Sequence, residues 1–218
     1  MKDRADAILQ AVQAHYLDAL GPPRDALLLE MEREAARRGE PISDPEVAAF
    51  LDLIARLKRP RVLIEVGTNI GYGAIVLARA AGEGARVHTV EKNEALCNEA
   101  QSWVARANVA DRVRVICDDA RSFLSTFEGS VDLVYIDCVK EHYVDYLDAL
   151  LPKMSEGAVL LADNVLWKGH VASEAVPESE RTRVSVLRAF NQRICTSKEF
   201  RGLILPLGDG VAFGIRTS

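Results

Sequence analysis

The sequence predicts an α/β fold: a doubly wound parallel sheet with an antiparallel end and with helices added at the N-terminus. Two observations carry this prediction. From residue 61 on, short and nearly continuous apolar runs alternate with helical patterns, which is typical of parallel strands buried on both faces. The segment 200–218 differs, because it predicts two strands joined by Gly208-Asp209-Gly210, the signal of a hairpin turn.

Composition and charge indicate an ordinary globular protein. In a chain of 218 residues, 49% are hydrophobic and 27% are charged, which suits one domain over 1–218, with N-terminal helices over 1–58 and the core over 59–218. No apolar run approaches the roughly 18 residues of a membrane span, and the N-terminus lacks the hydrophobic stretch of a signal peptide. We therefore expect a cytoplasmic protein without a membrane partner. The net charge of −5 disfavours a large nonspecific nucleic-acid surface, although a local basic patch stays open.

Three helices are expected before the sheet begins. Apolar residues at helical spacing predict the first over 2–20, and the glycine and prolines of 21–23 end it. The second covers about 25–38 and stops at Gly39. The third follows residues 43–46 (SDPE), which have the S-x-x-E form of a capping box and place a proline near the first helical position.

Five apolar runs predict the parallel strands, and helical segments separate them. We expect strands at 61–66, 86–90, 112–116, 131–136 and 158–162, and helices at 71–81, 94–107, 120–127, 142–151 and 180–195. In a doubly wound sheet, ligands bind beyond the carboxyl ends of the strands. Candidate functional residues are therefore those that directly follow the five apolar runs.

The first strand enters its helix through a glycine-rich turn, EVGTNIGYG, at residues 65–73. Glycine lets a backbone turn tightly and approach a ligand closely. The spacing G-x-x-x-G-x-G differs from the G-x-G-x-x-G of dinucleotide folds. Alone, such a turn is as consistent with a tight connection as with a cofactor site.

Acidic side chains lie at or just after the ends of the first three strands: Glu65, Glu91 and Asp119. Glu91 can accept hydrogen bonds from both hydroxyls of a ribose, and Asp119 can accept one from an adenine amino group. Each also has a structural alternative, because Glu91 suits a helix N-terminus and Asp119 suits an N-cap. Together the three acids predict an adenosine site.

The fourth and fifth strands also end in oxygen-bearing side chains. Asp137 follows the fourth, with Lys140 three residues later, and Asp163 and Asn164 follow the fifth. Two carboxylates and an amide oxygen suit a hard divalent cation, Mg²⁺ first and Mn²⁺ or Ca²⁺ as alternatives. Asp137 could instead cap the next helix, and Asp163-Asn164 could be turn residues.

Several segments together resemble the cation-dependent O-methyltransferases of the catechol and caffeoyl-CoA type: IEVGTNIGYGAIVLA, TVEKN, DDA, YIDCVKEHY, LLADNVLWKGHVA and LPLGDGV. The resemblance covers about residues 25–216. It implies the class I, Rossmann-like fold of methyltransferases that use S-adenosylmethionine (SAM), with seven strands of which the last is antiparallel. It also implies a homodimer.

The resemblance assigns roles to the candidate residues. Asp137, Asp163 and Asn164 would hold the cation, and Lys140 would act as the catalytic base beside Asp137. The residues expected to bind SAM are Ile42, Glu65, Gly67, Asn69, Gly73, Glu91, Asp119, Ala120 and Asp137.

The methyl acceptor is expected to be a small aromatic compound with two neighbouring hydroxyls, which can both approach the cation. The alternative is 5-hydroxyuridine in tRNA, because segment 26–42 resembles a bacterial branch with that activity, and the metal motif fits both acceptors. Trp167 and Lys168 could wall the acceptor pocket or simply cover the loop. Arg181 and Arg183 could form a solvated face or meet an anionic acceptor.

Two other classes of protein compete with this interpretation. The glycine spacing and the acidic strand ends disfavour a nicotinamide-dependent oxidoreductase. A non-catalytic SAM-binding protein stays open on the sequence alone.

Overall fold

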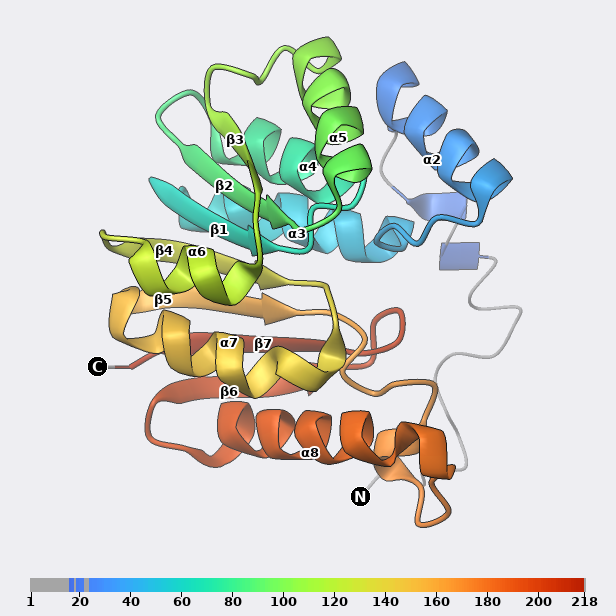
Figure 1. The fold of residues 1–218 in the computed structure, drawn as a ribbon, viewed down its shortest axis with the longest axis vertical. Coiled ribbons are helices and arrows are strands. Elements are labelled where there is room, and N and C mark those ends of the chain that lie inside the picture. Colours follow the sequence, from blue (N-terminus) through green and yellow to red (C-terminus); the bar gives the residue numbers. More distant parts are fainter. Residues whose placement is uncertain (1–15, 18, 22–23, 218) are drawn as a thin grey trace.

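The structure is a computed structural model that describes residues 16–17, 19–21 and 24–217. Its centre is a seven-stranded sheet in the order β3-β2-β1-β4-β5-β7-β6 (Figure 1). The strands are β1 Val62–Val66, β2 Arg86–Glu91, β3 Val113–Cys117, β4 Val131–Ile136, β5 Met154–Ala162, β6 Phe200–Leu205 and β7 Val211–Arg216. Strands β1 to β5 are parallel, and β7 runs antiparallel to both of its neighbours, which confirms the predicted class I architecture.

Helices cover both faces of this sheet. They are α2 Ala26–Arg38, α3 Pro45–Lys58, α4 Tyr72–Ala81, α5 Glu94–Arg106, α6 Ala120–Thr126, α7 Tyr143–Leu150 and α8 Arg181–Thr196, with short 3₁₀ turns η1 Lys140–His142, η2 Leu151–Lys153, η3 His170–Ala172 and η4 Glu178–Glu180. One apolar core joins α2, α3, α4 and α5 to one face, and a second joins α6, α7 and α8 to the other (Figure 1). Because an apolar core covers each face of the parallel sheet, side chains on both sides of the strands are buried, and the strands are apolar almost throughout.

The strand order reverses direction between β1 and β4. β1 pairs with β2 on one side and with β4 on the other, so the crossovers on the two sides lie on opposite faces. At such a switch point the loops after the two strands separate and leave a crevice at the carboxyl edge. This edge carries most of the predicted site residues.

Most element boundaries match the sequence predictions within two residues, and the start of β5 differs. β5 begins at Met154, because Met154 pairs with Val131 and the register shifts before Leu133 meets Val159. The capping-box prediction for α3 is wrong. The N-cap residue is Asp44, not Ser43, and it makes no side-chain cap bond. The Ser43 hydroxyl lies 2.9 Å from that of Tyr135 instead.

The N-terminal part of the chain can be compared only in part. The helix predicted over 2–20 falls largely outside the described residues. Among the residues that are described, no helix is long and apolar enough to cross a membrane.

Candidate functional site

The loop between β1 and α4 crosses directly over the end of β4. Gly67 has a φ of 102°, and a Cβ there would lie 1.9 Å from the backbone oxygen of Asp137. Gly71, the N-cap of α4, has a φ of 91° and provides no side-chain cap bond. The close approach explains the first glycine. The uncapped N-terminus of α4 offers backbone N–H groups to an anionic group such as a carboxylate.

Glu65 lies beneath this loop and is almost completely buried, with 1% of its surface exposed. The Thr89 hydroxyl donates to its Oε2 at 2.5 Å, and the hydroxyls of Thr68 and Thr89 are also 2.5 Å apart. A Cβ at Gly73 would lie 2.2 Å from Oε1 of Glu65, so any larger residue there would displace this carboxylate. Burial is the main cause that raises the pKa of Glu65 to about 8, and the Asp137 carboxylate raises it further. Glu65 therefore supports the loop from within the protein.

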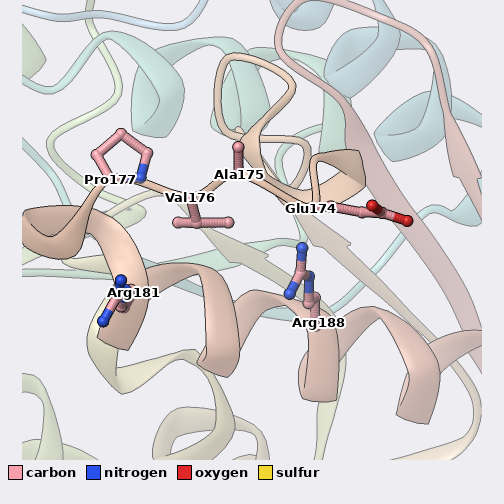
Figure 2. Close-up of a pocket in the computed structure, with 6 residues that line it drawn as sticks. All are labelled: Glu174, Ala175, Val176, Pro177, Arg181 and Arg188. Carbon is pink, nitrogen blue, oxygen red and sulfur yellow. The ribbon is translucent and has the colours of Figure 1, made fainter.

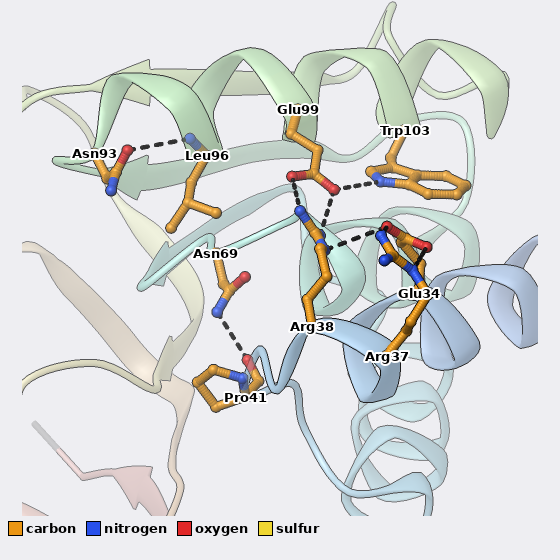
Figure 3. A network of polar contacts seen from close by, with 9 residues as sticks. All are labelled: Glu34, Arg37, Arg38, Pro41, Asn69, Asn93, Leu96, Glu99 and Trp103. Carbon is orange, nitrogen blue, oxygen red and sulfur yellow. Dashed lines mark hydrogen bonds and ion pairs between the residues drawn. The ribbon is translucent and has the colours of Figure 1, made fainter.

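Asn69 joins the glycine loop to its neighbours, and Figure 3 shows its side-chain contact with Pro41. The backbone N–H of Asn69 donates to Glu91 at 3.1 Å, and the Asn69 side chain donates to the Pro41 carbonyl at 2.8 Å. The bond to Pro41 holds the segment that contains Ile42 against the glycine loop. The Asn69 Oδ1 atom is buried and has no hydrogen-bond partner within the described part of the chain. This atom is a free acceptor for a donor on a ligand.

Asp119 is the N-cap of α6, the alternative that the sequence left open. Its carboxylate accepts from the backbone N–H of Arg121 at 2.9 Å, and the bond from the Arg121 side chain holds the pKa of Asp119 below its usual range. Ala120 starts the helix and is buried. Capping leaves the second carboxylate oxygen with only a long contact of 3.5 Å, to the Arg121 guanidinium. The predicted contact with adenine stays a prediction.

The ends of β1, β4 and β5 lie side by side and bring Asp137 next to Asp163. The backbone N–H of Asp137 donates to the Val66 carbonyl, and that of Asp163 donates to the Ile136 carbonyl, both at 2.9 Å. Asp163 is 2% exposed. Burial, followed by the negative charge of Asp137, raises its pKa to about 7. The buried carboxylate of Asp163 thus lies next to the partly buried one of Asp137, which is electrostatically unfavourable.

Lys140 supplies a cation at this place. Its Nζ donates to Oδ1 of Asp137 at 3.0 Å, and the side chain is buried, with 6% of the residue exposed. Nζ also lies 5.3 Å from the ring centre of Tyr143 and 6.0 Å from that of Trp167. The structure therefore brings the predicted base, Asp137 and the acceptor wall together.

The donor set fits a hard cation. Among the described residues no three His, Cys, Asp or Glu side chains are grouped to hold a metal ion, so a site here depends on the amide of Asn164 as its third ligand. Asn164 has a φ of 55°, and its backbone N–H donates to Oδ1 of Asp163 at 2.6 Å. Two crowded carboxylates offset by one lysine leave negative charge that a divalent cation would neutralise.

Trp167 is held in place by a network on one side of the site. Its indole N–H donates to Glu180 at 2.7 Å, and the Arg183 guanidinium lies 4.5 Å from its ring centre. Arg183 also pairs with Glu180 at 2.6 Å and with Glu141 at 2.8 Å. Arg183 is partly exposed and pairs with two carboxylates of this network, and its contact with an anionic acceptor stays a prediction. Lys168 is exposed, and its Nζ lies 5.8 Å from the same ring.

A cavity of about 680 Å³ lies between segment 174–177 and α8 (Figure 2). Arg181 and Arg188 line it from the helix, and Arg188 donates to the carbonyls of Val171 and Ser173 and so holds the segment. None of the residues predicted to bind SAM or the cation line it. The cavity lies beside the Trp167 network, apart from the strand ends.

Four residues that support the site were missed by the sequence analysis: Ser43, Thr68, Thr89 and Tyr135. All four are buried hydroxyl residues. Thr89 and Tyr135 bond directly to a predicted acid, and Thr68 and Ser43 bond to these two hydroxyls. Thr89 and Tyr135 interrupt apolar strand patterns, and that interruption was a usable signal. Thr68 carried none beyond its place in the glycine loop.

Comparisons with known proteins agree with this geometry. The sequence pattern of the O-methyltransferase family matches residues 24–217. The caffeoyl-CoA O-methyltransferase of Stellaria longipes is 26% identical, over 94% of this chain and 91% of that protein. The catechol O-methyltransferase of Niastella koreensis is 29% identical, over 95% of this chain and 97% of that protein.

Solved structures give the same result. An O-methyltransferase from Bacillus cereus, solved in complex with SAH, has a TM-score of 0.82 and 28% identity, and covers 93% of this chain and 96% of its own. TomG of Streptomyces achromogenes, solved in complex with SAM, has a TM-score of 0.84 over the whole of both chains and 24% identity, which supports the fold alone. By its sequence pattern over nearly its whole length and by its sheet order, the chain belongs to the O-methyltransferase family.

Proposed function

We propose that this SAM-dependent O-methyltransferase methylates one hydroxyl of a small aromatic vicinal diol, with a divalent cation held by Asp137, Asp163 and Asn164. The observation that carries the proposal is the pair of neighbouring carboxylates at adjoining strand ends. Asp163 is almost fully buried, and Lys140 is bonded to the partly buried Asp137. A structural role alone does not explain this pair, because the negative charge of Asp137 destabilises the ionised form of the buried Asp163.

The residues of the proposed site have distinct tasks in this reaction. SAM, when bound, would supply an electrophilic methyl group, and Asn69 Oδ1 and the α4 N-terminus offer hydrogen bonds for its polar ends. The cation, when bound, would supply Lewis acidity that lowers the pKa of an acceptor hydroxyl, which is about 10 for a phenol. Lys140, in its neutral form, would take the hydroxyl proton. Trp167, fixed by Arg183, would keep water away from the reacting atoms.

The charge around the site favours a small acceptor over tRNA. Burial, followed by the carboxylates of Asp137 and Asp209, raises the pKa of Asp44, so negative charge collects at this edge of the sheet. Such a field opposes a polyanion. The relatives described above bear the names of caffeoyl-CoA and catechol enzymes, and tRNA is therefore not the favoured acceptor. The homodimer and the cytoplasmic location stay predictions.

The proposal is tested with labelled SAM and a panel of acceptors: catechol, caffeate and tRNA that contains 5-hydroxyuridine. We expect methylation of a diol in Mg²⁺, and a loss of at least about a hundredfold with EDTA or in Asp163→Ala. Asp111→Ala, which removes an exposed carboxylate elsewhere, should keep full activity. Full activity in EDTA would refute the role of the cation, and activity on tRNA alone would refute the acceptor.

A further inference from the structure

Behind the predicted cation ligands lies a buried chain of hydroxyl groups. Tyr135 lies in β4, between Glu65 on β1 and Leu161 on β5, and is 1% exposed. Its hydroxyl is 3.3 Å from Oδ2 of Asp163 and 2.9 Å from Oγ of Ser43, which is also buried. Ninety-two positions separate Ser43 from Tyr135, so the contact arises only in the folded chain.

The direction of the two hydrogen bonds follows from the number of protons. A phenol hydroxyl has one proton, and an ionised carboxylate can only accept. Tyr135 therefore donates to Asp163, and Ser43 must donate to Tyr135. The other oxygen of Asp163 accepts from the backbone N–H of Asn164 at 2.6 Å. Both carboxylate oxygens are thus held from the protein side, and the plane of the group is fixed.

We propose that Tyr135, supported by Ser43, is a positioning residue that holds the Asp163 carboxylate ready for the divalent cation. This inference rests on the proposed function, because it assumes that Asp163 is a cation ligand. The series of hydrogen-bonded hydroxyls begins at Ser43. Ser43 lies beside Ile42, in the segment that Asn69 binds through Pro41. The position of the cation ligand thereby depends on the segment that borders the predicted cofactor site.

Partners that orient a metal ligand typically contribute a factor of ten to a hundred in metal affinity. The test measures Mn²⁺ binding to the full chain by electron paramagnetic resonance, without SAM and without turnover. We expect Tyr135→Phe to weaken Mn²⁺ about tenfold, and Ser43→Ala to weaken it by less. In the Tyr135→Phe background, Ser43→Ala should weaken Mn²⁺ binding no further, because the hydrogen bond from Tyr135 to Asp163 is already lost.

Two controls separate the possible outcomes. Tyr72→Phe removes the hydroxyl of a tyrosine that is 2% exposed and bonds to Glu32 at 2.7 Å, and should leave the Mn²⁺ affinity unchanged. Asp163→Ala should abolish binding, and if it does not, the proposed cation site itself is wrong. If Asp163→Ala abolishes binding while Tyr135→Phe stays within twofold of the parent, the positioning role is refuted. Should Tyr135→Phe fail to fold by circular dichroism, an unchanged affinity in Ser43→Ala refutes it equally.

Discussion

Glu65 should make the stability of the protein depend strongly on pH. Its pKa is about 8 in the folded chain, against an ordinary value of 4.5, chiefly because of burial. A carboxyl group with a raised folded pKa contributes stability that is complete below the unfolded pKa and is lost as pH rises through the folded pKa. The loss should therefore occur between about pH 4.5 and pH 8. With each pH unit equal to about 1.4 kcal/mol, the free energy of unfolding would fall by up to about 5 kcal/mol.

The variant Glu65→Gln removes this titration and keeps the shape of the side chain. Its carboxamide oxygen can still accept from Thr89, whose hydroxyl is 2.5 Å from the carboxylate. We expect the variant to lose much less stability than the parent between pH 5 and pH 8, as measured by urea denaturation. Asp163 titrates in the same window, but it does so in both proteins and cancels in their difference. A difference that stays constant from pH 5 to pH 8 would refute the reasoning.

Three further predictions follow from the geometry. Lys140→Met should lower kcat by about a hundredfold or more in protein that stays folded by circular dichroism, and unchanged turnover would exclude Lys140 as the base. Gly67→Ala should destabilise the chain by more than about 2 kcal/mol, because its Cβ would meet a backbone oxygen at 1.9 Å. Gly84→Ala, whose Cβ would meet nothing within 4 Å, is its control in the same urea titration. Arg183→Ala should raise the acceptor KM several-fold and alter the fluorescence of Trp167, and no change in either would contradict the proposed wall.

The sequence was sufficient for the fold because the relevant signals are local. Strands buried on both faces are apolar throughout, and helices show a period of 3.6, so each element could be recognised from its own residues. Asp137 and Asp163 could be placed together for the same reason, since parallel strands carry their carboxyl ends to one edge. The early start of β5 was missed, because Ser155, Glu156 and Gly157 do not resemble a strand.

Contacts between distant segments were not predictable in the same way. Ser43 has the spacing of a capping residue, yet its hydroxyl bonds to Tyr135. The buried phenol hydroxyl of Tyr135 needs a hydrogen-bond partner, and the fold brings Ser43 next to it. Arg183 likewise pairs with Glu141, which precedes it by more than forty positions. A local sequence pattern indicates which groups a residue can bond to. Which partner it does bond to depends on the segments that the fold brings next to it.

The carboxyl edge of the sheet combines features that stability alone would not favour. Glu65 and Asp163 are almost fully buried, both have raised pKa values, and the charge of Asp137 contributes to each. In the described part of the chain, Lys140 is the one cation bonded to this group of acids. A sulfonium cofactor and a divalent cation would each bring positive charge to the same edge. The unfavourable charge of the ligand-free protein is therefore the electrostatic complement of the two ligands that the proposed reaction requires.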